Sequence, residues 1–169
     1  MGSRRKAREL ALKTLYEAEF SVLRPVGTAK DEHEDSADTL AEKAPDDFFK
    51  RVGREAGAFA ETLIRGVLGH QGEIDDLIGK YSENWRIERM ARIDRNILRI
   101  GIYELIYLDD VPPQVSINEA VELAKKYSSL ESSSFVNGIL DQVLRERAVQ
   151  SPAGTTKGEC VSKGSKKAT

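Results

Sequence analysis

The sequence contains few of the residues that carry covalent or metal chemistry. Only one of its 169 residues is cysteine, and only two are histidine, His33 and His70. The single cysteine, Cys160, builds neither a disulfide framework nor a zinc cluster, and neither histidine has a second histidine or cysteine at ligand spacing. We therefore expect a reducing compartment, no metal site and no cofactor.

Long apolar runs are also missing. No stretch approaches the roughly 18 apolar residues that a membrane-spanning helix needs. Met1 is followed by charged residues rather than by the apolar region of a signal peptide. Both absences favour a soluble, cytoplasmic protein that has no membrane partner.

Motifs that bind nucleotides or activate a nucleophile are absent as well. The sequence has no G-x-G-x-x-G, no Walker-type phosphate loop and no serine in a nucleophile elbow. Its many acidic residues are spread over expected helix caps and solvated faces, so no pair of titratable groups in an apolar cleft indicates acid–base catalysis. We interpret the chain as a binding protein without catalytic residues, and not as an enzyme.

Strand patterns are missing too, because the apolar residues recur at helical spacing and do not alternate with polar ones. This spacing predicts an all-α fold, a single compact domain of about six or seven helices. The expected helices span residues 3–23, 47–68, 73–81, 93–108, 116–127 and 133–148, with a short amphipathic turn at 85–90. We expect residues 1–149 to form this domain, with a mobile acidic connection at 25–47, and residues 150–169 to form a disordered polar tail.

The segment 93–108 is apolar on almost every side, which is typical of a central helix packed by several neighbours. We expect Gly101 to allow close approach of another backbone. Gly138 is expected at a close helix crossing, since glycine otherwise weakens a helix interior by about 1 kcal/mol. Ser116 and Glu119 have the spacing of a capping box, which predicts that the following helix begins there.

The first expected helix carries two apolar stripes. The first has the spacing of a core-facing side and consists of Ala7, Ala11, Thr14, Leu15, Ala18 and Val22. The second lies well away from it and consists of Leu12, Tyr16, Phe20 and Leu23. One buried stripe is enough for a helix in a globular domain, so the second stripe predicts contact with a partner.

Charge is concentrated at the start of the same helix. The formal net charge of the chain is only -2, so affinity for nucleic acid has to come from local clustering. Such a cluster is formed by Arg4, Arg5, Lys6 and Arg8. Cations at a helix N-terminus oppose the helix dipole, at a cost of roughly a few tenths of a kcal/mol each, so a polyanionic partner explains them better than helix stability does. The plain alternative is a solvated, charged helix end.

Four segments together resemble the NusB family of bacterial transcription antitermination factors. They are RRKARELALKTLYE near the N-terminus, WRIERMARIDRNILRIGIYEL in the centre, VPPQVSINEAVELAKKY after it and FVNGILDQV near the C-terminus. The resemblance implies an all-helical fold that binds the boxA element of nascent ribosomal leader RNA. It also implies pairing with NusE, a small-subunit ribosomal protein, and assembly with other Nus factors on RNA polymerase.

The resemblance also assigns residues to surfaces. It places RNA at the arginine-rich first helix, here Arg4, Arg5, Lys6 and Arg8, and at the FVNG aromatic with the turn before it, here Phe135 and Ser133. It places NusE at Tyr16 and Asp94, and we extend that partner surface along the second stripe to Leu12 and Phe20. Arginine and aromatic side chains suit single-stranded RNA, because phosphates pair with guanidinium groups and bases stack on rings.

Three other readings of the sequence remain open at this stage. The second stripe can join two copies in a homodimer that hides the RNA surface until NusE competes for it. The chain can be a helical adaptor without antitermination activity. The family's fold also occurs as an RNA-binding domain of ribosomal RNA methyltransferases, but this chain has no glycine-rich cofactor loop.

Overall fold

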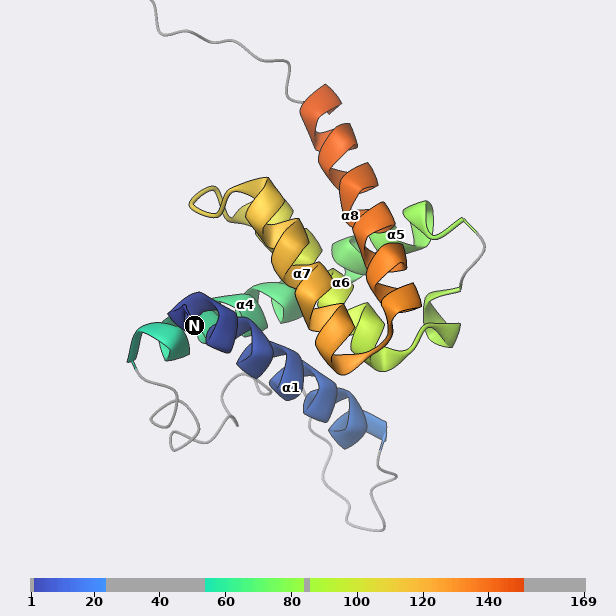
Figure 1. The fold of residues 1–169 in the computed structure, drawn as a ribbon. Coiled ribbons are helices and arrows are strands. Elements are labelled where there is room, and N and C mark those ends of the chain that lie inside the picture. The colour runs from blue at the N-terminus through green and yellow to red at the C-terminus, as the bar shows by residue number, and fades with distance from the viewer. Residues whose placement is uncertain (1, 24–53, 84–85, 151–169) are drawn as a thin grey trace, which may run out of the picture.

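The computed structural model describes residues 2–23, 54–83 and 86–150, and for 20–23, 54–56 and 149–150 the description is confined to the backbone (Figure 1). The predicted acidic connection at 25–47 lies outside the described residues, and so does the predicted tail beyond Gln150.

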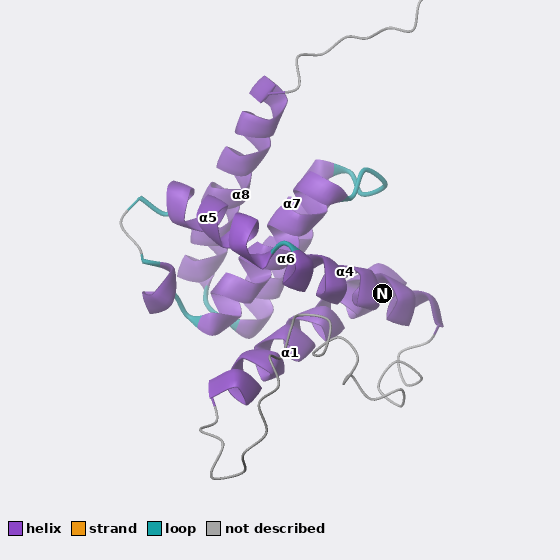
Figure 2. Cartoon of the chain, turned by 180° about the vertical axis from the view of Figure 1, so that it is seen from behind, coloured by secondary structure: helices purple, strands orange, loops and turns teal. Residues whose placement is uncertain are grey.

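Every element in the described part of the chain is a helix, which confirms the all-α prediction (Figure 2). The elements are α1 (Ser3–Leu23), α4 (Arg54–Gly69), α5 (Gln71–Tyr81), the 3-10 helix η1 (Ile87–Arg89), α6 (Arg92–Tyr107), α7 (Pro113–Tyr127) and α8 (Leu130–Gln150). None of these helices is long and apolar enough to span a membrane.

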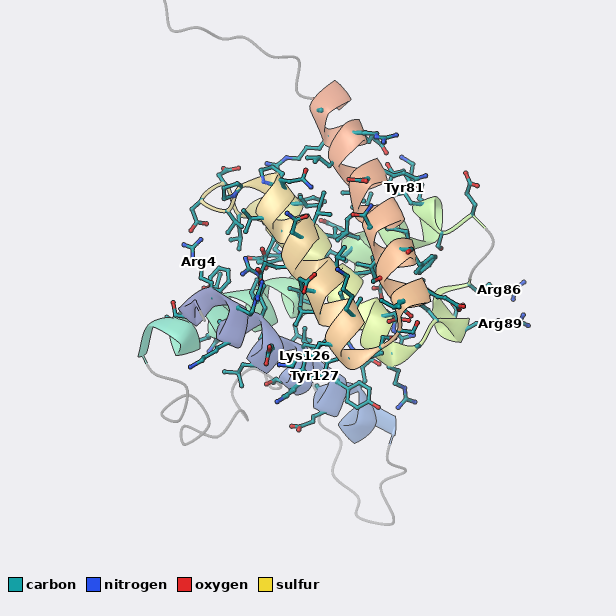
Figure 3. All side chains as sticks on the ribbon, in the orientation of Figure 1. Arg4, Tyr81, Arg86, Arg89, Lys126 and Tyr127 are labelled. Carbon is teal, nitrogen blue, oxygen red and sulfur yellow. The ribbon has the colours of Figure 1, made fainter. Side chains whose placement is uncertain are left out.

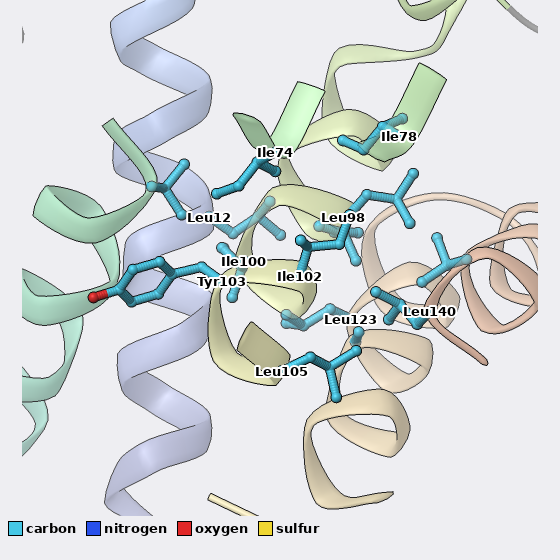
Figure 4. Close-up of a cluster of buried hydrophobic side chains, with 14 of the residues drawn as sticks. Leu12, Ile74, Ile78, Leu98, Ile100, Ile102, Tyr103, Leu105, Leu123 and Leu140 are labelled. Carbon is cyan, nitrogen blue, oxygen red and sulfur yellow. The ribbon is translucent and has the colours of Figure 1, made fainter. Parts of the chain in front are cut away.

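Helix α6 is the centre of the fold, as its all-round apolar sequence predicts. It packs against α1, α4, α5, α7 and α8. Ile97, Leu98 and Ile102 are wholly buried, and Figure 4 shows the apolar side chains of α6 among those of its neighbours. Burying each such side chain stabilises the fold by about 1.5–3 kcal/mol, so most of the core energy is concentrated around this helix.

The charged residues of α6 have partners inside the fold. The Arg99 guanidinium donates to both carboxylate oxygens of Asp75 at 2.7 and 2.8 Å, and to Glu19 at 2.5 Å. Arg95 also donates to Glu19, at 2.8 Å. These ion pairs join α1, α5 and α6. Burial acts to raise the pKa of Glu19, but the hydrogen bonds and charges of Arg95 and Arg99 outweigh it, so that the pKa lies below its usual value.

Close packing requires glycine at two positions. A Cβ on Gly66 would lie 1.9 Å from the Tyr103 ring, and one on Gly101 would lie 2.9 Å from Leu140. The close approach expected at Gly101 is therefore present, although a side chain makes it and not a backbone. The prediction for Gly138 is wrong, because this residue is exposed and a Cβ there would meet nothing within 4 Å.

Two helix starts differ from the sequence prediction. Helix α7 begins at Pro113, and proline suits a first helical position because its missing N–H needs no partner there. The predicted capping box is wrong, since Ser116 is buried within the helix and donates its hydroxyl to Glu104. Helix α8 begins at Leu130, where the Ser129 hydroxyl accepts from the backbone N–H of Ser132 at 3.0 Å and so caps the helix.

Candidate nucleic-acid interface

The predicted basic cluster lies at the start of α1, close to α4, α6 and α7. Arg4 donates to Asp110, in the loop before α7, at 2.6 Å, and Figure 3 labels Arg4 at the edge of the molecule. Arg5 donates through two nitrogens to the carboxylate of Glu119 on α7, at 2.9 and 2.5 Å. Of the four cations in this cluster, Lys6 is exposed and forms no ion pair with an acid of the described residues.

Most of the positive charge at this surface is therefore neutralised by neighbouring acids. The hydrogen bond from Arg5 holds the pKa of Glu119 below its usual value, and Glu119 in turn raises the pKa of the Arg5 guanidinium. Arg4 also lies over the Phe59 ring, 5.0 Å from its centroid. The start of α1 is thus a set of accessible ion pairs rather than a free positive patch.

Arg8 differs from the other three cations because it is buried. It is 3% exposed and donates to both carboxylate oxygens of Glu104, at 2.6 and 2.8 Å. Ser116 donates to the same carboxylate at 2.9 Å. The expectation that Arg8 contacts RNA therefore has no accessible guanidinium to support it, because the residue lies on the core side of α1 and joins it to α6.

The second stripe of α1 is only partly on the surface. Leu12 is 1% exposed and belongs to the core (Figure 4), so its predicted outward position is wrong. The reason is that α1 packs between α4 and α6, which cover more of its circumference than one stripe. Tyr16 is half-buried, and the side chain of Phe20 lies outside the described residues.

The surface beside Tyr16 is formed by α1 and the end of α7. Glu9 accepts from Lys126 at 2.7 Å and from the Tyr127 hydroxyl at 2.9 Å. Figure 3 shows Lys126 and Tyr127 next to α1. Three residues further along, Leu130 is 75% exposed, which is unusual for a large apolar side chain. The sequence analysis missed Leu130, because it lies in a serine-rich turn outside any apolar stripe.

Asp94 lies where α6 meets the start of α8. It is 7% exposed, and one carboxylate oxygen accepts from Ser132 at 2.9 Å. The other oxygen is buried and has no hydrogen-bond partner among the described residues. The carboxylate is thus turned toward α8, whereas a direct contact with a partner requires it at the surface.

Ser133 and Phe135 lie in the first turns of α8. Ser133 is buried and donates its hydroxyl to the carbonyl of Leu130 at 2.6 Å, while Phe135 is half-buried and lines a groove between α5 and α8. Across this groove stands Tyr81. An aromatic edge in a groove offers a surface on which a base can stack.

Two exposed arginines that the sequence analysis did not select lie in and beside η1. Arg86 and Arg89 point away from the body of the molecule in Figure 3, and neither forms an ion pair with an acid of the described residues. The sequence does contain a pattern that could have indicated them, because arginine occurs at every third position from 86 to 95. The apolar residues between these arginines favour a structural role for the segment.

The two groups of predicted RNA residues are separated in space. Arg4 contacts Asp110, just before α7 begins, whereas Phe135 follows the end of α7. Helix α7 has 15 residues and is therefore about 22 Å long. The candidate interface thus consists of a paired basic end and an aromatic end at opposite ends of α7.

The described residues form an all-helical fold that carries accessible arginines and half-buried aromatic side chains on its surface. In the described residues no group of three or more histidine, cysteine, aspartate or glutamate side chains is arranged to hold a metal ion. The family model described as the NusB family matches residues 5–145. The chain therefore belongs to the NusB family.

Known relatives agree with this assignment. The chain is 49% identical to the transcription antitermination protein NusB of Myxococcus xanthus, over 85% of this chain and 95% of that protein. It is 47% identical to the protein of the same name from Symbiobacterium thermophilum, over 85% and 90% of the two chains.

Solved structures show the same fold. NusB of T. maritima superposes with a TM-score of 0.68 at 36% identity, covering 85% of this chain and 91% of that one. A chain from a complex of the antitermination factors NusB and NusE with double-stranded RNA superposes with a TM-score of 0.66 at 27% identity, covering 86% and 98%.

Proposed function

We propose that the chain is a transcription antitermination factor that binds boxA RNA of ribosomal RNA operon leaders together with NusE. It acts as part of the Nus complex on RNA polymerase. The observation that carries this proposal is membership of the NusB family along residues 5–145, supported by the likeness to a chain from a NusB–NusE–RNA complex.

The accessible cations and aromatic residues on the surface suit an RNA strand. Arg4, Arg5 and Lys6 provide phosphate contacts at one end of α7, and Phe135 provides a stacking ring at the other. Arg86, which is exposed beside η1, offers a further cation. Phosphate contacts fix the strand and stacked bases add about 1–3 kcal/mol each, so an extended single strand can use both sites.

The surface around Tyr16 suits the protein partner. Tyr16, Tyr127 and the exposed Leu130 provide apolar area, and Lys13 and Lys126 surround it with charge. An apolar centre with a charged rim is the usual composition of a protein–protein contact. A partner at this surface would lie beside the end of α7 that is followed by Phe135.

The RNA contacts are tested by fluorescence anisotropy with a labelled boxA-containing RNA at fixed salt, with and without NusE. Replacing Arg4 and Lys6 by alanine should weaken binding about tenfold or more, because two phosphate contacts are lost. The matched control replaces Arg65 and Arg145, two exposed arginines elsewhere, by alanine. Equal affinities of the two double variants would place RNA elsewhere on the chain.

The partner surface is tested by co-purification with NusE. Tyr16→Asp places a charge in the proposed contact and should abolish the complex. Val115→Asp introduces the same charge at an exposed apolar residue of α7 and should leave the complex intact. A complex retained by Tyr16→Asp moves the partner to another surface, and sedimentation of the isolated chain shows whether a homodimer uses this one instead.

A further inference from the structure

Two arginines at the start of α1 each form an ion pair with one particular acid. Arg4 and Asp110 lie 2.6 Å apart, and Arg5 is held by Glu119 through two hydrogen bonds. The two acids come from different elements, the loop before α7 and α7 itself. In the folded chain, each of these two guanidinium groups is therefore paired with a carboxylate, although the sequence alone suggests that both are unpaired cations.

A carboxylate and a phosphate compete for the same atoms of arginine. The planar guanidinium donates two parallel hydrogen bonds to either group, so a guanidinium fork paired with a carboxylate is not available to RNA until the acid leaves. Whether the acid can leave depends on burial. The Arg4 and Asp110 side chains are 49% and 60% exposed and those of Arg5 and Glu119 are 39% and 17% exposed, whereas those of Arg8 and Glu104 are only 4% and 1% exposed.

We propose that Asp110 and Glu119 compete with RNA phosphates for Arg4 and Arg5, and so set the affinity of this end of the chain for RNA. The inference rests on the proposed function. RNA binding here is an exchange of one anion for another, and only a polyanion that engages both arginines together displaces both acids. The two acids thereby lower the affinity for isolated anions and for brief contacts with other RNA.

Asp110 is not needed to hold α1 in place, whereas Glu119 is less exposed and also lies 3.9 Å from the Arg8 guanidinium. The buried Arg8–Glu104 pair already joins α1 to α6, and an exposed ion pair such as Arg4–Asp110 contributes about 1 kcal/mol or less to folding. Asp110→Asn and Glu119→Gln remove one charge each and keep the shape of the side chain. Asp110→Asn should therefore fold normally. Circular dichroism and a melting curve verify this, and they also measure what Glu119→Gln costs in stability.

The chain offers a matched control for each acid. Asp109 adjoins Asp110 in sequence but pairs with Arg147, at 3.2 Å. Glu122 lies on α7 one turn from Glu119 and pairs with Lys125, at 2.8 Å. Asp109→Asn and Glu122→Gln change the net charge by the same amount without freeing Arg4 or Arg5, so they measure the general effect of losing one negative charge.

The experiment is anisotropy of the full chain with a labelled, boxA-containing single-stranded RNA at several salt concentrations. Asp110→Asn and Glu119→Gln should each tighten binding by about two- to fivefold relative to their controls, which is the range that an exposed ion pair covers. The slope of log K against log salt should stay nearly the same as that of the unaltered chain, because the same phosphate contacts form once the acid has left. In an Arg4→Ala background, Asp110→Asn should add no more than Asp109→Asn does.

Affinities of Asp110→Asn and Glu119→Gln that match those of Asp109→Asn and Glu122→Gln would overturn the inference. It would also be overturned if the gain from Asp110→Asn persisted in the Arg4→Ala background. Failure of the proposed function has a different signature, because the unaltered chain and all variants would then show no RNA binding with or without NusE.

Discussion

Replacing Arg8 by alanine tests whether this residue belongs to the core or to the RNA surface. In the structure its guanidinium forms two hydrogen bonds with Glu104, and the two side chains are 4% and 1% exposed. After the substitution the Glu104 carboxylate keeps only the hydroxyl of Ser116 as a donor. An uncompensated buried charge costs about 3–5 kcal/mol, so Arg8→Ala should lower the free energy of unfolding by that amount.

A loss of this size is easily measured. In a domain of this length each kcal/mol lowers the melting temperature by about 2–4 °C, which predicts a fall of roughly 6–20 °C. Urea unfolding followed by circular dichroism gives the free energy directly. The matched control is Arg65→Ala, which breaks an exposed pair with Glu61 and should cost about 0.5 kcal/mol or less.

A second variant separates the lost charge pair from lost packing. Replacing Arg8 by methionine and Glu104 by leucine removes both charges and keeps most of the volume, so this double variant should be more stable than Arg8→Ala alone. If Arg8→Ala unfolds at the same urea concentration as Arg65→Ala, the Arg8–Glu104 pair does not stabilise the core. Arg8 would then again be a candidate for contact with RNA.

Two further predictions concern packing and pH. Gly66→Ala should destabilise the fold by about 1–3 kcal/mol, because the added Cβ meets the Tyr103 ring. Gly138→Ala should stabilise the fold by about 1 kcal/mol, because the added Cβ meets open space. Equal free energies of unfolding in urea for the two variants would contradict the packing argument. The pKa of Glu19 lies below its usual value of 4.5 in the folded chain, so its ion pairs with Arg95 and Arg99 stabilise the fold above that pH and are lost as pH falls through the folded pKa. Glu19→Gln should therefore flatten the stability profile below about pH 4.5, and an unchanged profile would show that these two ion pairs do not contribute.

Much of the fold follows from the sequence alone. Period 3.6 in the apolar residues is sufficient to predict helices, and the observed bounds of α5 and α6 lie within two residues of the predicted ones. Helix starts were less predictable. Serine and glutamate at capping-box spacing favour a start at Ser116, but Pro113 already suits a first helical turn and Glu104 takes the serine as a donor.

The candidate site was predicted less completely, because exposure is not a local property. Arg8 and Leu12 have the spacing of a surface stripe, and only the packing of α4 and α6 around α1 buries them. Leu130 shows the reverse case, since an apolar residue without periodicity remains exposed. Arg86 was visible in the sequence but was assigned to a mainly structural segment.

The sequence by itself determined the all-helical class, the central position of α6 and the family, because periodicity and motif spacing are properties of neighbouring residues along the chain. Only the tertiary structure decided which cations are available to an anion. Asp110 and Glu119 lie more than a hundred residues from Arg4 and Arg5, and their carboxylates reach the guanidinium groups only after α7 has packed beside α1. Ion pairing depends on the distance between two charged groups in space, and their separation along the sequence does not predict that distance.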